Sequence, residues 1–531
     1  MEFYTFIGKK GSKIFYRGIR NGRDVSELVP FKPKLYVRCL KNKATHKDFY
    51  GGPVAEMEFD TSYDMFQFLK SYGDIPNEVW GNKNVVTQFI WEKFGPNIEY
   101  NLKDIQGAFI DIEVLTREKV NGTWIDGGFP NAAEAKFPVN AICQYCTNDK
   151  KYHVFSLAKW SKENSCFPDL AENTDYHYYE TEIELLRGWL RFWKSAYPHY
   201  ITGWNVENFD IPYLVNRITT VLGDARELSP CRDVIEHTIN TKYGTEKTYD
   251  IVGIAVLDYL ELYKKHTFVT RESYTLDFIA ETELQEHKKE FTGTHGSFFW
   301  DNPQGFQDYN IKDVNLVVGI DAKLQLLNLV LSLSYFAGIN YTDTFSPIRI
   351  WDTLIYRECM NRGIIVSCNT IKKEREEYEG AYVFPTKNAM YKAIASFDAT
   401  SLYPSVNRTW NIGADTIVSN EKREQIISEI KTQCVEHGNE ELARLAHSNI
   451  PLIEYYRDNG LPEYVTDILK KHKVSLSLNW QFFSTEHEAI TTYLQSKLFN
   501  ERKNDKEKAK YYTQREKDLY QEILRRKLAC E

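Results

Sequence analysis

The sequence predicts a multidomain protein that combines α/β and α+β architecture. The chain has 531 residues, more than one hydrophobic core normally organises, so two to four domains are expected. Residues 106–326 alternate strand-like and helical patterns, as α/β domains do. Residues 1–105 show short strand-like runs broken by Gly and Pro, with one helical pattern, which is typical of a small α+β module.

Composition and charge exclude several classes of protein. A net charge of −8 excludes a generally basic nucleic-acid binder, so any contact with DNA must come from local patches. Aromatic residues make up 14% of the chain, which fits large cores and also surfaces that stack bases. The N-terminal segment has no signal-peptide pattern, and no run of about 18 apolar residues predicts a membrane span.

The nine cysteines are scattered along the chain. Cys143 and Cys146 form the only CxxC pair, and no second pair follows at zinc spacing. Reduced thiols are therefore expected, with neither a metal nor a redox role for this pair.

The first module has strand-like runs at 3–7 and 35–37 and a helical pattern at 61–72. Residues 327–369, helical and then irregular, are expected to join residues 1–105 in one N-terminal domain. Sheet modules that expose aromatic residues can bind RNA, so an RNA-binding role stays open. No RNA-recognition signature is present, and a scaffold role is favoured.

The second module begins with a strand-like stretch at 108–114, in which apolar residues flank Asp111 and Glu113. Residues two apart on a strand point to the same side, so the two carboxylates lie next to each other. Adjacent carboxylates repel each other unless a cation lies between them, and hard cations such as Mg²⁺ prefer oxygen ligands. The alternative is an exposed edge strand with two solvated acids.

The rest of residues 106–326 continues the alternation. Strands are expected at 139–146, 152–157 and 255–259, a hairpin at 238–249, and a helix at 181–195. Thr181 and Glu184 have capping-box spacing at the start of that helix. Residues 200–214 read as strand, loop and helix, with Asp210 at the start of the helix, where the helix dipole favours an acid.

Tyr309 and Asp313 are four residues apart at the start of another expected helix, so they share one helix face. Alone, such a pair is usually solvated. Together with Asp111, Glu113 and Asp210, it predicts a site for two divalent cations, which can hold an attacking water and a leaving oxygen in line at a phosphorus atom. Tyr309 is a neutral donor that could orient the water.

The C-terminal part is less regular. A β-rich region is expected from residue 378 and includes 395–405, whereas residues 413–462 remain ambiguous. Residues 485–531 read as one long helix with a narrow apolar seam at Tyr512, Leu519 and Ile523, which predicts a partner helix.

Four motifs in this order resemble the replicative DNA polymerases of T-even-like phages, within family B. They are FIDIEV at 109–114, GWNVENFDIP at 203–212, YNIKDV at 309–314 and FDATSLYPS at 397–405. The resemblance implies a ribonuclease H-like 3′→5′ exonuclease domain at 106–326, a partial polymerase palm at 370–484 and one arm of a helical fingers hairpin at 485–531. It implies that Asp111, Glu113, Asp210 and Asp313 bind two Mg²⁺ ions, which Mn²⁺ can replace, and that Tyr309 positions the water.

The resemblance also implies roles in nucleotidyl transfer. Asp398 would be one of two palm aspartates that bind metal. Ser401, Leu402 and Tyr403 would lie under the incoming dNTP, with Tyr403 crowding a ribose 2′-hydroxyl. Arg502 and Lys506, in LFNERKNDK, would hold the triphosphate, although a basic pair one turn apart is otherwise a solvated helix face. The hairpin around Tyr243 and Gly244 matches a wedge that moves a frayed primer end.

The chain departs from this family after Asp398. The second fingers motif, Asn-Ser-x-Tyr-Gly, and the second palm carboxylates, Asp-Thr-Asp, do not occur, and the palm loop expected within 419–484 is not found. A single carboxylate cannot hold the two metals that nucleotidyl transfer needs. We expect a naturally split polymerase over a truncated chain, with a second polypeptide supplying the rest of palm, fingers and thumb.

The partners that this interpretation implies are primer–template and single-stranded DNA, dNTP and the second chain, through which a sliding clamp would bind. The protein would act in the cytoplasm of an infected bacterium, with no membrane. Two alternatives stay open: a stand-alone 3′→5′ exonuclease with an idle palm fragment, and an RNA-binding translational regulator.

Overall fold

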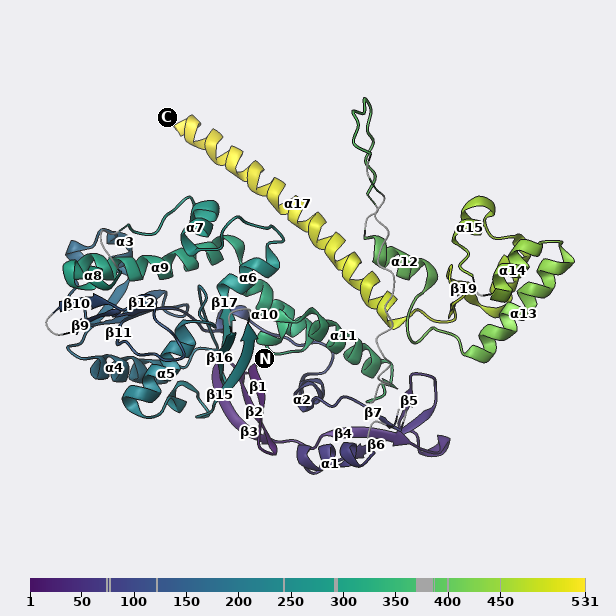
Figure 1. Ribbon diagram of the computed structural model, residues 1–531, viewed down its shortest axis with the longest axis horizontal. Coiled ribbons are helices and arrows are strands. Elements are labelled where there is room, and N and C mark those ends of the chain that lie inside the picture. The colour runs from purple at the N-terminus through teal and green to yellow at the C-terminus, as the bar shows by residue number, and fades with distance from the viewer. Residues whose placement is uncertain are drawn as a thin grey trace. The chain divides into compact units, whose positions relative to one another are not determined.

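The computed structural model describes residues 1–72, 75, 78–120, 123–241, 244–290, 295–368, 385, 387–398, 401–448 and 450–530 (Figure 1). The chain forms two compact units. Unit 1 comprises Met1–Leu35, Glu56–Gly73 and Gly81–Thr353, and unit 2 comprises Tyr36–Ala55, Asp74–Trp80 and Leu354–Glu531. The architecture is mixed α/β and multidomain, as the sequence predicts.

A six-stranded mixed sheet lies at the centre of unit 1, in the order β13-β12-β11-β8-β14-β17. The strands are β8 (Gly107–Val114), β11 (Val139–Cys146), β12 (Lys151–Ser156), β13 (Thr174–Tyr178), β14 (Tyr200–Gly203) and β17 (Ala255–Asp258). β8 runs parallel to β14 and antiparallel to β11, and β14 runs parallel to β17. The strands expected at 108–114, 139–146, 152–157 and 255–259 are confirmed within a residue or two at their ends.

Helices cover both faces of this sheet (Figure 1). On one face, α4 (Glu182–Ser195) and α5 (Asp210–Leu222) pack against the even-numbered residues of β8, in a core that includes Ile110, Ile112 and Trp189. On the other face lies α9 (Pro303–Leu324), whose Tyr309 joins a smaller cluster with Ala141 and Phe306. The capping box of α4, between Thr181 and Glu184, is present as predicted.

The remaining elements of residues 107–337 connect or flank this sheet. They are β9 (Arg117–Val120), β10 (Thr123–Asp126), η3 (Lys162–Asn164), α3 (Pro168–Glu172), η4 (Arg226–Leu228), β15 (Val234–Thr241), β16 (Gly244–Ile251), α6 (Tyr259–His266), α7 (Leu276–Leu284), α8 (His295–Asp301) and α10 (Leu326–Ala337). β15 and β16 pair antiparallel, so the predicted hairpin is confirmed and is longer than expected. Its turn residue Tyr243 lies outside the described residues.

The N-terminal strands β1 (Glu2–Lys10), β2 (Lys13–Arg20) and β3 (Arg23–Pro30) form an antiparallel sheet within unit 1. The Arg17 side chain, 3% exposed, donates to the carbonyl oxygens of Pro198 at 2.6 Å and Gly253 at 2.9 Å. A buried guanidinium must have its hydrogen bonds satisfied, so Arg17 joins this sheet to loops of the six-stranded sheet. Further helical elements, in chain order, are α1 (Ser62–Tyr72), α2 (Val85–Phe94), η2 (Leu102–Asp104), η5 (Thr342–Phe345) and α11 (Pro347–Asn361).

A second sheet has the strand order β18-β5-β6-β4-β7. Its strands are β4 (Lys34–Arg38), β5 (His46–Asp48), β6 (Pro53–Glu58), β7 (Val79–Trp80) and β18 (Ile364–Ile365), with η1 (Lys41–Lys43) in a connection. A small core of Tyr36, Val54, Trp80 and Ile365 lies in unit 2.

Residues 413–484, which include the stretch 413–462 that was ambiguous in sequence, form a helical module within unit 2. It contains α13 (Asn420–Glu436), α14 (Glu440–Ser448), α15 (Ile453–Asn459), α16 (Glu463–His472) and the short strands β19 (Val474–Leu476) and β20 (Phe482–Ser484). Its separate core includes Ile430, Leu442 and Trp480, each fully buried. The chain therefore has a packed helical module in the region where the family resemblance implies a palm loop.

Two predictions were wrong: the element type expected at 395–405 and the first residue of the helix that carries Tyr309. Residues 387–398 contain no strand, and the residues after Ser401 form a helix, α12 (Leu402–Trp410), where a β-rich region was expected. The helix that carries Tyr309 begins earlier than predicted because Asn302 caps it and Pro303 occupies its first turn. The long C-terminal helix is confirmed as α17 (Ile490–Cys530), and the seam residues Tyr512, Leu519 and Ile523 are exposed.

Among the described helices, none is by itself long and apolar enough to span a membrane. α9 and α10 pass that test only as a pair, and they are bent by 59° at Gln325.

Candidate active site

β8 places two acids on one face of the central sheet. Asp111 lies opposite Cys143 of β11, and Glu113 lies opposite Ala141. The Glu113 side chain is buried, while Asp111 is partly exposed. Both therefore face the α9 side, because their even-numbered neighbours fill the core beneath α4 and α5.

The loop after β14 brings a third acid to β8. Asp210, the first residue of α5, is 3% exposed, and its Oδ1 accepts a hydrogen bond from the Ile112 amide at 3.0 Å. This contact requires a close approach at Gly203, where a Cβ atom would lie 2.3 Å from the Ile110 carbonyl oxygen. Glycine at 203 thus permits the crossing that delivers Asp210.

α9 supplies the fourth acid and the tyrosine. Tyr309 and Asp313 lie one turn apart and both are buried. Between them, Asn310 donates from Nδ2 to Asp111 Oδ2 at 2.8 Å, which ties α9 to β8. The structure therefore brings Asp111, Glu113, Asp210, Tyr309 and Asp313 together, as the sequence predicts.

Lys288 also belongs to this cluster, although no motif in the sequence pointed to it. It lies in the polar segment after α7, and its Nζ donates to the Tyr309 hydroxyl at 3.2 Å and to Asp313 Oδ2. Burial disfavours the charge on this ammonium, but attraction by Asp313 and Tyr309 raises the pKa of Lys288 above its ordinary value. The cluster thus contains one permanent cation.

The acids raise one another's pKa. Burial and repulsion from Asp210, Glu113 and Asp313 raise the pKa of Asp111 well above its usual range. Burial, together with repulsion from Asp313, raises the pKa of Glu113 to about 8. Burial also raises the pKa of Asp210 to about 7, although backbone amides partly offset this effect, and it raises the pKa of Asp313 despite attraction by Lys288. Each shift has burial as its largest cause, and the repulsion between neighbouring carboxylates adds to it.

The residues fit divalent cations. One lysine cannot neutralise four carboxylates, and Asp313 Oδ1 is buried without a hydrogen-bond partner among the described residues. An unpaired buried carboxylate oxygen is costly unless a cation contacts it. The donors are all oxygens, and hard ions such as Mg²⁺ and Mn²⁺ prefer oxygen ligands over the nitrogen and sulfur ligands typical of zinc.

The residues expected to act in nucleotidyl transfer are more exposed. Asp398 is exposed in a segment without helix or strand, and Ser401, with φ 52°, precedes α12. Leu402 and Tyr403 begin α12 and are 55% and 75% exposed. Arg502 and Lys506 are exposed on α17, and no described hydrogen bond or ion pair joins them to the other residues of this set.

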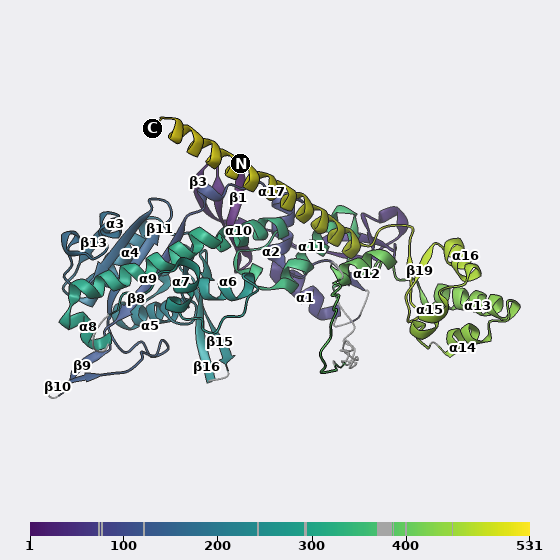
Figure 2. The same cartoon turned by 90° about the horizontal axis from the view of Figure 1, so that it is seen from above.

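α12 does pack against the start of α17. Thr492 Oγ1 donates to the Asn407 carbonyl oxygen at 3.4 Å, and the Arg408 guanidinium lies 4.7 Å from the centroid of the Phe499 ring. The helix that carries Tyr403 is thus fixed beside the base of the helix that carries Arg502. Figure 2 shows the same two helices from above.

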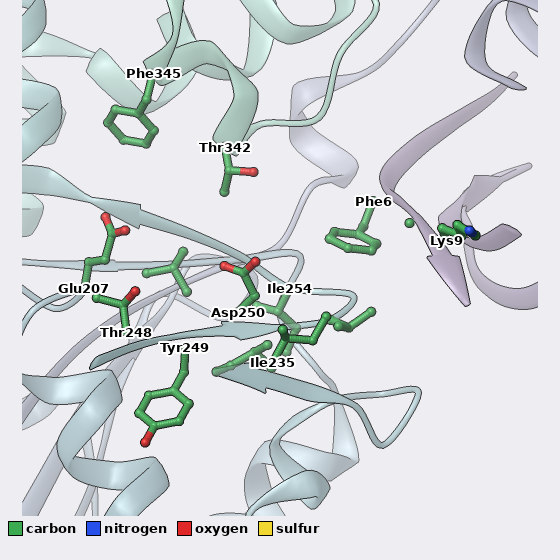
Figure 3. Close-up of a pocket in the computed structure, with 14 residues that line it drawn as sticks. Phe6, Lys9, Glu207, Ile235, Thr248, Tyr249, Asp250, Ile254, Thr342 and Phe345 are labelled. Carbon is green, nitrogen blue, oxygen red and sulfur yellow. The ribbon is translucent and has the colours of Figure 1, made fainter. Parts of the chain in front are cut away.

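Unit 1 also contains a cavity of about 330 Å³, distinct from the acid cluster. It lies between β1 and the base of the β15–β16 hairpin, where Phe6, Ile235 and Asp250 line it (Figure 3). None of the four acids or Tyr309 lines it, so this cavity is separate from the acid cluster.

Two family models match the chain. The model for "DNA polymerase family B, exonuclease domain" matches residues 94–279, which include Asp111, Glu113 and Asp210. The model for "DNA polymerase family B" matches residues 344–526, which include Asp398, Tyr403 and Arg502.

Curated relatives agree with these models. The chain is 35% identical over 438 residues to a DNA-directed DNA polymerase of Escherichia phage RB69, which covers 78% of this chain and 47% of the relative. It is 31% identical to the DNA-directed DNA polymerase of Enterobacteria phage T4, with the same coverage of both chains. It is 25% identical to the DNA polymerase delta catalytic subunit of Drosophila melanogaster, over 60% of this chain and 29% of the relative. The chain therefore spans about half the length of the two phage polymerases.

Proposed function

The chain belongs to DNA polymerase family B, and from this premise we propose that it carries a 3′→5′ proofreading exonuclease of ribonuclease H-like fold. One observation carries the proposal. Carboxylates from β8, α5 and α9, up to 202 positions apart in sequence (Asp111 to Asp313), meet at β8, where Asp210 accepts from the Ile112 amide and Asn310 of α9 donates to Asp111. Such a cluster is unfavourable without cations and suits hydrolysis of a phosphodiester assisted by two metals.

We assign different roles in this reaction to the side chains of the acid cluster. Asp111, Glu113, Asp210 and Asp313 hold the two Mg²⁺ or Mn²⁺ ions, which supply an activated water and neutralise charge on the phosphate when bound. Tyr309 orients the water through its hydroxyl group, which stays protonated because burial raises the pKa of Tyr309 above its ordinary value. Lys288 holds Tyr309 and Asp313 in a fixed geometry, and Asn310 fixes one oxygen of Asp111.

A labelled single-stranded DNA oligonucleotide tests the exonuclease. We expect the chain to shorten it from the 3′ end with Mg²⁺ or Mn²⁺, and the double variant Asp111→Ala, Glu113→Ala to lose activity on the order of 10³-fold. The matched control is Asp169→Ala, Glu172→Ala, two exposed acids on α3, which should retain activity. Equal digestion by the first double variant would refute the assignment.

For the polymerase half, we propose the roles that the family motif implies. Asp398 is one of the palm carboxylates for metal, Ser401, Leu402 and Tyr403 lie under the incoming dNTP, and Arg502 and Lys506 contact its triphosphate. α17 is then one arm of the fingers hairpin and residues 370–484 are part of the palm. The match over residues 344–526 and the packing of α12 on α17 support this proposal.

Nucleotidyl transfer needs carboxylates that are not among these 531 residues, because no Asp-Thr-Asp follows Asp398. We propose that a second polypeptide supplies them, together with the thumb and any contact with a sliding clamp, and that the complex acts on primer–template DNA in the cytoplasm of an infected bacterium. The phage relatives support the setting.

A pull-down with the tagged chain from infected cells, followed by primer extension, tests the second chain. A stable heterodimer that extends a primer supports the proposal. Recovery of one longer polypeptide that contains this sequence would contradict it, and so would a chain that degrades DNA without any partner for synthesis.

A further inference from the structure

A second group of metal-ligating side chains lies at the end of the β11–β12 hairpin. Cys146 is the last residue of β11, Asp149 lies in the turn, and His153 is on β12. One ligand atom from each residue lies within 4.8 Å of the others. His153 Nε2 is 2.8 Å from Asp149 Oδ2.

This group lies on the face of the sheet opposite the acid cluster. Cys143 of β11 lies opposite Asp111 of β8, so its side chain points to the same face of the sheet as Asp111. The side chains of Gln144 and Cys146 point to the other face, because successive side chains on a strand alternate. Gln144 Oε1 accepts from Trp189 Nε1 of α4 at 3.0 Å, which places this set on the α4 side. The group therefore cannot share an ion with Asp111 or Glu113.

Two of the three ligands are buried while the third opens to solvent. Cys146 is 9% exposed and His153 is 7% exposed, and Asp149 is exposed at the turn. The contact between His153 Nε2 and Asp149 Oδ2 needs a proton between the two atoms, and a divalent cation can replace that proton. The exposed side leaves room for an entry path and for a water as a fourth ligand.

Neighbouring side chains hold these ligands as the outer shell of a metal site would. Gln144 Nε2 donates to Cys146 Sγ at 3.2 Å, and the tryptophan contact in turn fixes Gln144. Asp175 Oδ2 lies 3.9 Å from His153 Nδ1, on the side of the ring away from Asp149. Lys151 Nζ donates to Asp175 Oδ2 at 3.0 Å, so Asp175 adds a negative charge near His153 Nδ1 without a hydrogen bond to the ring.

We propose that Cys146, Asp149 and His153 bind one divalent cation of the zinc class, which fastens the β11–β12 turn. Sulfur, nitrogen and oxygen ligands together select a borderline ion such as Zn²⁺ over Mg²⁺, and three protein ligands plus one water complete a tetrahedron. Cysteine binds such an ion as its thiolate, so the Cys146 thiol proton passes to solvent when the ion binds.

Cobalt serves as a spectroscopic probe of this site in the full chain. With Mg²⁺ in excess to saturate the acid cluster, one equivalent of Co²⁺ should give a thiolate-to-cobalt charge-transfer band that Zn²⁺ abolishes. Cys146→Ser should remove the band, and Asp149→Asn, an exposed position unlikely to disturb folding, should weaken cobalt binding about 10-fold or more.

The control is Cys231→Ser, a partly buried thiol outside the group, which should leave the band unchanged. Circular dichroism of each variant without metal checks that it is folded, and Zn²⁺ should raise the melting temperature of the parent chain but not of the Asp149→Asn variant. Absence of the band in the parent chain, or an identical band in Asp149→Asn and parent, would overturn the proposal.

Discussion

The acid cluster of unit 1 and the palm segment of unit 2 carry related proposed chemistry but differ in how they are built. In unit 1, four acids come from three elements that pack against the same sheet, and Asn310 and Lys288 fix them by hydrogen bonds. In unit 2, Asp398 is exposed in a segment without regular structure, and Tyr403 is 75% exposed.

This difference shows what each region requires. The four carboxylates proposed to bind metal in unit 1 all lie on elements of that unit, β8, α5 and α9. In unit 2, the proposed metal ligand Asp398 and the proposed nucleotide contacts Leu402 and Tyr403 are exposed, and our proposal assigns the other carboxylates to a second chain. Activity that depends on unit 1 alone should therefore survive damage to unit 2.

Trp480 offers the strongest test of that independence. It is fully buried in the helical module, and its Nε1 donates to the Ile450 carbonyl oxygen at 2.8 Å. Trp480→Ala should lower the free energy of unfolding of this module by about 3–5 kcal/mol, because it removes the largest side chain of that core. Denaturant melts should show the loss while exonuclease activity stays within about twofold of the parent, and Trp480→Phe should be milder. A parallel loss of nuclease activity would show that the two regions are coupled.

Lys288 tests whether the acid cluster needs its cation. Lys288→Met removes the charge but keeps most of the side-chain volume, so Tyr309 and Asp313 lose their shared partner. We expect a fall in exonuclease rate of about 10–100-fold, typical of a residue that positions metal ligands. Rates at saturating Mg²⁺ check this, with Lys289→Met as the neighbouring control. If Lys288→Met matched the parent, the positioning role would be wrong.

Without metal, the acid cluster should make the stability of unit 1 depend on pH. The folded chain binds the Glu113 proton more tightly than the unfolded chain, since its pKa is about 8 instead of the ordinary 4.5. The contribution of Glu113 to the free energy of unfolding is therefore fully present below about pH 4.5. It is lost as the pH rises toward 8, which lowers the free energy of unfolding by about 1–3 kcal/mol. Melting temperatures in EDTA should decrease over this range, and Glu113→Gln should flatten the curve. A melting temperature that rises with pH would contradict the repulsion described here.

Local pattern was enough to predict much of the exonuclease region. The alternating strand at 108–114, the capping box of α4 and the hairpin at 238–249 are all present, because periodicity and capping act over a few residues. The β-rich region expected at 395–405 was wrong, and α12 forms there instead. The β-prone residues of that stretch do not gain a partner strand within the described residues, and strands depend on such partners more than helices do.

The CxxC motif shows the limit of reading spacing alone. Cys143 and Cys146 are three apart, which on a strand sends them to opposite faces, so they cannot share an ion. The candidate partners of Cys146 come from the turn and from β12, where only the hairpin register brings them together. The sequence argument about zinc considered only the spacing of cysteines and did not address this group.

The order of motifs along the chain by itself indicated the resemblance to family B polymerases and singled out the four acids and Tyr309 as candidates, because residue types at fixed local spacing can be read without a fold. Only the tertiary structure decided that Lys288 joins those acids, that residues 413–484 pack as a separate helical module, and that Cys146 meets His153. Each of these depends on contacts between segments distant in sequence or on opposite strands, and the free energy of such contacts comes from burial and charge that no local pattern records.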